Sequence, residues 1–110
     1  GLCRILEEQP EWRVVAQAAN GLDAIRLATE LKPGLAIVDI AMPGMNGIET
    51  TRHLRRDLPE LRVLIVSMHA DIPHVARALQ AGAHGYVLKD TSDAEMVRAV
   101  NLVASGTPFL

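Results

Sequence analysis

Two short apolar runs constrain the fold of this chain more than any other feature. Residues 35–38 (Leu-Ala-Ile-Val) and 63–66 (Val-Leu-Ile-Val) contain no polar side chain, and each run ends directly before a polar residue. Continuous apolar runs of this length are typical of parallel strands that helices cover on both faces. The two runs therefore predict an α/β fold built around a parallel sheet.

Helical patterns alternate with these runs along the whole sequence. Ser92 and Glu95 have the spacing of a capping box, which marks the start of a helix. Strands that alternate with helices form a three-layer α/β fold with right-handed crossovers. We therefore expect four strands, over residues 12–18, 35–39, 63–67 and 85–89, and five helices, over residues 1–9, 22–31, 48–58, 75–82 and 92–106.

Composition limits the class of protein. A chain of 110 residues with 49% hydrophobic and 22% charged side chains predicts one globular domain over residues 1–110. A net charge of −2 argues against direct binding of nucleic acid by this segment. Cys3 is the only cysteine, which excludes an internal disulfide and favours a cytoplasmic location. No apolar run approaches the roughly 20 residues that span a bilayer.

Three polar residues stand where three predicted strands end. Asp39, Ser67 and Lys89 each follow an apolar run. The carboxyl ends of parallel strands meet at one edge of a sheet, which is where such folds bind ligands. A carboxylate can attack phosphorus, while an ammonium and a hydroxyl stabilise charge on the transferred oxygens. The three residues therefore suit phosphoryl transfer.

Several segments around these residues resemble one family. The segment 38–47 (Val-Asp-Ile-Ala-Met-Pro-Gly-Met-Asn-Gly) resembles the phosphoacceptor segment of bacterial two-component response regulator receiver domains. The segments 67–69 (Ser-Met-His) and 81–90 (Ala-Gly-Ala-His-Gly-Tyr-Val-Leu-Lys-Asp) resemble the subfamily with a LuxR-type helix-turn-helix output. The resemblance covers nearly the whole chain and implies a CheY-like, flavodoxin-like doubly wound parallel sheet.

The resemblance also assigns roles to individual residues. It implies that Asp39 accepts the phosphoryl group and that Lys89 and Ser67 bind it. Ser67 and Tyr86 would form the switch, and Ala41 and His69 would tune dephosphorylation. Asp39 and the backbone carbonyl of Ala41 would be ligands of a Mg²⁺ cofactor. Without the resemblance, Asp39 is more commonly a cap or turn residue, Ser67 could simply satisfy the backbone at a strand end, and Tyr86 could be an ordinary half-buried ring.

This chain departs from the family pattern in two places. The acidic pair that completes the family's Mg²⁺ site follows the family's first strand, and no such strand stands before residues 12–18. We therefore expect a receiver domain that is incomplete at its amino end, and we expect Mg²⁺ binding to be doubtful. In the family's sheet order, 2-1-3-4-5, this strand lies between residues 12–18 and 35–39, so we expect an open slot there and a marginally stable chain. The bond from Lys89 to Asp90 replaces a common Lys-Pro bond, and we expect it to be trans.

Three functions remain open at this point. The resemblance implies a signalling switch that a sensor histidine kinase phosphorylates and that controls a carboxy-terminal helix-turn-helix domain, with homodimers possible and no enzymatic activity beyond its own phosphorylation and dephosphorylation. A receiver-like interaction module that works without phosphorylation is the alternative. A nucleotide or flavin binder is disfavoured because no glycine-rich loop follows a predicted strand. The four histidines, His53, His69, His74 and His84, lack the spacing of metal ligands.

Overall fold

The computed structural model describes residues 2–42, 44–69 and 71–107. Helices and strands alternate through most of this range, as the sequence predicts. Their order is α1 (Leu2–Glu7), α2 (Gly21–Leu31), β1 (Leu35–Asp39), α3 (Gly47–Asp57), β2 (Arg62–Ser67), α4 (Ile72–Gln80), β3 (Gly85–Leu88) and α5 (Asp93–Ala104).

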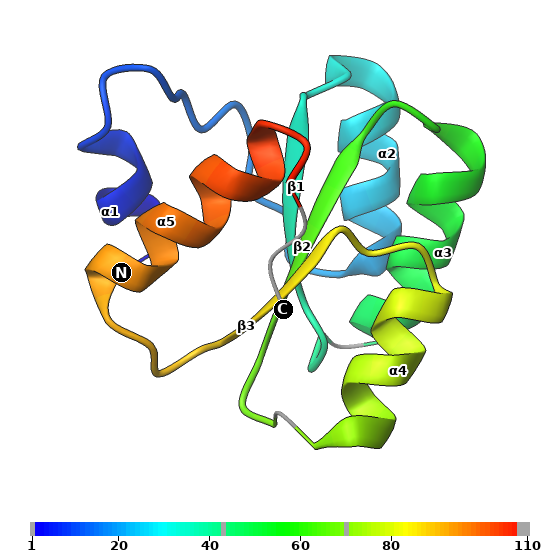
Figure 1. The fold of residues 1–110 in the computed structure, drawn as a ribbon. Coiled ribbons are helices and arrows are strands. Elements are labelled where there is room, and N and C mark those ends of the chain that lie inside the picture. The colour runs from blue at the N-terminus through cyan, green and yellow to red at the C-terminus, as the bar shows by residue number, and fades with distance from the viewer. Residues whose placement is uncertain (1, 43, 70, 108–110) are drawn as a thin grey trace.

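The three strands form one parallel sheet in the order β1-β2-β3. Helices α1 and α5 cover one face of the sheet, and α2, α3 and α4 cover the other (Figure 1). The predicted three-layer α/β fold with a parallel sheet is therefore confirmed.

The side chains of β2 alternate between the two halves of the core. Val63 and Ile65 pack with residues of α2, α3 and α4, whereas Leu64 and Val66 pack with residues of α5. This alternation follows from the period of two in a β-strand. All four side chains are buried, which explains why the run contains no polar residue.

The prediction of a strand over residues 12–18 is wrong. These residues carry no strand assignment, and among the described residues the sheet has three strands instead of four. A β-strand depends on hydrogen bonds to a neighbouring strand, and no ladder joins this segment to β1 in the described part of the chain. The apolar side chains of the segment therefore do not suffice to make it a strand.

An apolar cavity lies between this segment and the free edge of β1. Its volume is about 830 Å³, and both residues 11–18 and residues 35–38 line it. The remaining walls come from α1, α2 and α5, from Leu54 of α3 and from the loop residues Pro33 and Gly34. The slot that we expected between residues 12–18 and 35–39 is therefore open in the structure.

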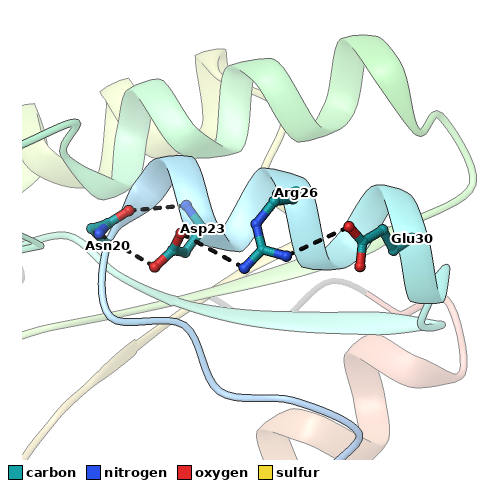
Figure 2. A network of polar contacts seen from close by, with 4 residues as sticks. All are labelled: Asn20, Asp23, Arg26 and Glu30. Atoms are coloured by element: carbon teal, nitrogen blue, oxygen red, sulfur yellow. Dashed lines mark hydrogen bonds and ion pairs between the residues drawn. The ribbon is translucent and has the colours of Figure 1, made fainter.

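Side chains cap the starts of three helices. The side-chain oxygens of Asn20, Asn46 and Ser92 each accept a hydrogen bond from a backbone amide three residues later. At Ser92 this confirms the predicted helix start. On α2 the cap continues along the exposed side of the helix, where Asp23, Arg26 and Glu30 form a chain of polar contacts (Figure 2). Exposed pairs of this kind stabilise a helix by only a few tenths of a kcal/mol, roughly 0.2–0.5 per pair.

Candidate functional site

The predicted site residues lie at the carboxyl edge of the sheet. Asp39, the last residue of β1, lies opposite Val66 in the parallel register. Ser67 is the next residue of β2, and its carbonyl oxygen accepts a hydrogen bond from the amide of Lys89 at 2.8 Å. The ends of three strands therefore bring Asp39, Ser67 and Lys89 to one place, as expected for a parallel sheet.

The side chains of Asp39 and Lys89 are in direct contact. The Lys89 Nζ atom lies 2.5 Å from Asp39 Oδ2, and the second carboxylate oxygen, Oδ1, accepts a hydrogen bond from the Ala41 amide at 2.9 Å. The Asp39 side chain is 29% exposed and that of Lys89 is 43% exposed. The carboxylate is thus oriented by two donors while solvent and small molecules still reach it.

Gly47 allows α3 to start against the end of β1. A Cβ atom at Gly47 would lie 2.4 Å from the carbonyl oxygen of Asp39 and 2.7 Å from the Cα of Ile40. The Gly47 amide donates a hydrogen bond to the Ile40 carbonyl at 3.0 Å, which fixes this close approach. Any side chain at position 47 would therefore clash with the backbone at Asp39 and Ile40.

The Ser67 hydroxyl is engaged by the loop that follows β2. Ser67 is 2% exposed, and its Oγ accepts a hydrogen bond from the amide of His69 at 3.0 Å. The hydroxyl hydrogen remains available for a second partner, because this bond uses only a lone pair of the oxygen. Ser67 therefore lies at the predicted edge of the sheet and contacts His69 there.

Tyr86 is buried and bonds to the same residue as Ser67. Its ring is 5% exposed, and its hydroxyl donates a hydrogen bond to the carbonyl oxygen of His69. The main chain of His69 therefore joins the two residues that we expect to form the switch. Nothing in the sequence marks this link, because it depends on the backbone of His69 and not on its side chain.

The ring of His69 has a separate set of neighbours. It stacks on the ring of His74 at 5.1 Å between centroids, and His74 Nδ1 lies 2.7 Å from Asp71 Oδ1. The hydrogen bond to His74 lowers the pKa of the Asp71 carboxyl below its ordinary value. No group of three or more histidine, cysteine or acidic residues that could hold a metal ion occurs in residues 2–42, 44–69 and 71–107.

The structure describes the peptide bond that follows Lys89 but not Pro43. Across the described residues no peptide bond is cis, so the bond between Lys89 and Asp90 is trans, as expected. Pro43, which belongs to the segment resembling the phosphoacceptor loop, lies outside the described residues.

Comparison with known families identifies the family and the fold of this chain. The pattern of the response regulator receiver domain matches residues 1–101. The chain belongs to this family. Because the matched range includes Asp39, Ser67, Tyr86 and Lys89, the receiver domain contains every side chain of the candidate site.

Individual proteins agree with this assignment. Over 110 residues, the whole of this chain, the receiver domain is 40% identical to the response regulator GacA of Pseudomonas viridiflava, of which it covers 51%. It is 38% identical to the transcriptional regulatory protein DegU of Brevibacillus brevis and covers 47% of that protein. The chain therefore spans about half the length of the curated relatives it matches.

A solved structure reproduces the fold closely. The receiver domain superposes with a TM-score of 0.94 on a two-component response regulator of the LuxR family from Aurantimonas, at 38% identity. The match covers 98% of this chain and 77% of the other. The expected CheY-like, doubly wound parallel fold of the LuxR-type subfamily is therefore confirmed. In the described part of this receiver domain no helix is long and apolar enough to cross a membrane.

Proposed function

We propose that this receiver domain accepts a phosphoryl group on Asp39 and acts as the switch of a response regulator. The observation that carries the proposal is the ion pair between Asp39 and Lys89, which lies at the carboxyl edge of the sheet with 2.5 Å between Nζ and Oδ2. Within the proposal, residues 1–110 form one receiver unit. The receiver has no enzymatic role beyond its own phosphorylation and dephosphorylation.

The chemistry is the transfer of one phosphoryl group to a carboxylate oxygen. An oxygen of Asp39 attacks the phosphorus of the donor, an O–P bond forms, and the bond between phosphorus and its leaving group breaks. The electron pair of the broken bond leaves with the donor. Lys89 neutralises charge on the transferred oxygens, since its ammonium already lies beside Asp39 Oδ2. Hydrolysis of the acyl phosphate breaks the new O–P bond, returns the carboxylate and releases inorganic phosphate.

Ser67 and Tyr86 would report the phosphoryl group to the rest of the domain. The Ser67 hydroxyl hydrogen can be donated to a phosphoryl oxygen while its oxygen keeps the bond from the His69 amide. A movement of Ser67 toward the phosphoryl group would then pull on His69 and on the hydrogen bond that Tyr86 donates to it. In the proposed switch, Tyr86 is the bistable element whose contacts change. Ala41 and His69 would tune how quickly water removes the phosphoryl group.

The described residues do not by themselves form a Mg²⁺ site. At this edge they offer the carboxylate of Asp39 and the backbone carbonyl of Ala41, and they contain no cluster of three acidic, histidine or cysteine side chains. Mg²⁺ is usually held by one or two carboxylates together with water and phosphate oxygens at near-octahedral geometry. Asp39 and the Ala41 carbonyl would supply one carboxylate and one carbonyl ligand, and water, phosphate oxygens and the family's acidic pair would have to supply the remaining ligands.

The partners follow from the same proposal. A sensor histidine kinase would donate the phosphoryl group, and a carboxy-terminal DNA-binding domain of the LuxR type would receive the signal in a homodimer of the regulator. Regulatory names among the relatives, such as the transcriptional regulatory protein DegU, support this assignment. We also propose a cytoplasmic location and no direct contact with nucleic acid by the receiver, whose net charge is −2.

The test compares two forms of the chain. One is the 110-residue chain, and the other, called the extended receiver, places the first strand and acidic pair of a related receiver ahead of Gly1. With magnesium and a small phosphodonor, intact-mass measurement should show one added phosphoryl group on the extended receiver and little or none on the 110-residue chain. Asp39→Asn should abolish the addition, whereas Asp90→Asn, which removes an exposed neighbouring carboxylate, should not.

The alternative function gives a different result. If the extended receiver acquires no phosphoryl group, or if Asp39→Asn acquires it equally well, the assignment of Asp39 fails. In the first case an interaction module that works without phosphorylation would be the better description, and in the second case another residue would be the phosphoacceptor.

A further inference from the structure

His84 lies at the opposite end of β2 from the candidate site. It comes directly before β3 and bonds to Val63, near the start of β2. The backbone amide of His84 donates to the Val63 carbonyl at 2.8 Å, and the Val63 amide donates to His84 Nδ1 at 3.0 Å. One residue therefore satisfies both main-chain groups of Val63.

The imidazole takes the place of a main-chain acceptor. In a parallel ladder the N–H of a strand residue is normally accepted by a carbonyl of the neighbouring chain. Before β3 the chain turns at Gly82, whose φ of +102° is incompatible with an extended strand. Val63 is fully buried, so its amide would otherwise lack a partner. The ring of His84 thus adds one hydrogen bond between β2 and the chain just before β3.

This bond requires one protonation state of the ring. Nδ1 accepts a hydrogen bond only when it carries no proton, so the ring must be neutral with its proton on Nε2. The charges of two cations act on the ring, Arg55 on α3 and Arg62 on β2. Arg55 is held in place by hydrogen bonds to the carbonyls of Pro59 and Leu61, and its side chain passes close to Gly82.

We propose that His84 is a pH-dependent positioning residue, whose neutral imidazole holds the start of β3 in register with β2. Strand β3 carries Tyr86 and leads into Lys89, so the register affects the placement of both. The functional consequence of this register rests on the proposed function, that is, on the roles of Tyr86 and Lys89. The hydrogen bond between His84 and Val63 does not depend on that proposal. Protonation of Nδ1 would remove the acceptor of the Val63 amide and add a third positive charge beside Arg55 and Arg62.

The direction of the pH effect follows from the environment of the ring. Burial lowers the pKa of His84 below its ordinary value of 6.5, and the charges of Arg55 and Arg62 lower it further. The unfolded chain therefore binds this proton more readily than the folded chain. The stabilisation by neutral His84 is complete above pH 6.5 and is lost as the pH falls through the lowered pKa of the folded state.

The decisive experiment measures hydrogen exchange of the Val63 amide and the imidazole tautomer by NMR, in the extended receiver and three variants of it. His84→Asn retains an acceptor but does not titrate, and His84→Leu removes the acceptor. His53→Asn is the matched control, because His53 lies on α3 and contacts Arg56 at the surface. The ring signals of Tyr86 are followed in the same samples.

We expect an Nε2–H tautomer and, after correction for the intrinsic pH dependence of exchange, a protection of Val63 at least tenfold lower at pH 5.5 than at pH 7.5. The Tyr86 ring signals should shift with the same midpoint. His53→Asn should behave as the parent chain, and His84→Asn should lose the pH dependence.

A proton on Nδ1, a pH-independent Val63 amide, or an unchanged acid response in His84→Asn would overturn the proposal. These results need no phosphorylation, and Asp39→Asn should not alter them. If His84→Leu does not fold, the tautomer of the parent protein and the pH dependence of Val63 protection in His84→Asn still test the proposal.

Discussion

The hydroxyl of Tyr86 donates a hydrogen bond to the main-chain carbonyl of His69. Tyr86→Phe removes this donor and leaves the carbonyl without it, while the buried ring is preserved. A hydrogen bond of this kind contributes roughly 0.5–1.5 kcal/mol, so we expect the free energy of unfolding to fall by about 1 kcal/mol. Urea titration of the parent chain and the variant would measure the change.

The same link predicts coupling between Tyr86 and Ser67. Ser67→Ala removes the acceptor of the His69 amide, so the two variants loosen the same residue from opposite sides. In a double-mutant cycle we expect a non-additive term of at least about 0.5 kcal/mol, whereas independent sites usually add within about 0.3–0.5 kcal/mol. Strict additivity would mean that His69 does not connect the two side chains.

Gly47 provides a sharp test of packing around Asp39. Alanine at a helix start is normally tolerated, but a Cβ atom here would lie 2.4 Å from the Asp39 carbonyl oxygen. We expect Gly47→Ala to lower the free energy of unfolding by about 1–3 kcal/mol, as overpacking does. Gly34→Ala is the control, because no atom lies within 4 Å of the added carbon, and it should be neutral or slightly stabilising. Equal stabilities of the two variants would contradict the close approach of α3 to β1.

Lys89 should matter for phosphoryl transfer more than for stability. Its pair with Asp39 is partly exposed, and such pairs contribute at most about 1 kcal/mol. In the extended receiver, Lys89→Met should slow formation of the acyl phosphate at least tenfold while changing the unfolding free energy by less than about 1 kcal/mol. Phosphorylation kinetics at fixed donor concentration would show this, and Lys89→Arg should retain part of the rate. A Lys89→Met variant that is phosphorylated at the parent rate would exclude the proposed role.

The cavity beside β1 predicts weak stability of the 110-residue chain. Its apolar walls remain exposed to solvent or dye, and the free strand edge can pair with other chains. We expect binding of a hydrophobic dye, concentration-dependent aggregation and an unfolding free energy below about 5 kcal/mol, the lower end for natural domains. The extended receiver, whose added strand can occupy the slot, should bind less dye. If both forms unfold with equal stability and neither binds dye, the cavity is closed in solution.

Local sequence signals predicted most of this structure. The apolar runs before Asp39 and Ser67 form buried strands because their side chains alternate between two apolar layers. The cap at Ser92 lies within three residues of its partner, so the sequence alone marks it. Residues 12–18 were predicted wrongly because strand formation depends on a distant partner that the segment's own apolar character does not supply.

The candidate site shows the same limit. Strand ends place Asp39 beside Lys89, and a sequence pattern marks strand ends well. The links through His69 and between His84 and Val63 depend on backbone groups that only the folded chain brings together. No pattern of residue types reports such contacts, because the main chain is the same at every position.

The two ends of strand β2 lie beside two different sites, His84 at one end and the candidate phosphoacceptor site at the other. Val63 contacts His84 near one end of the strand, and Ser67 lies at the other end, next to the residue opposite Asp39. The two residues are four positions apart, or roughly 13 Å in an extended strand. Salt screens charges over about 8 Å where they are exposed, but much less across a buried strand such as β2, so it does not isolate one end from the other. An exchange of His84 would therefore reach the acceptor edge through the register of β3, which carries Tyr86 and leads into Lys89, so acid sensitivity and phosphate chemistry would be inherited or engineered together in this domain.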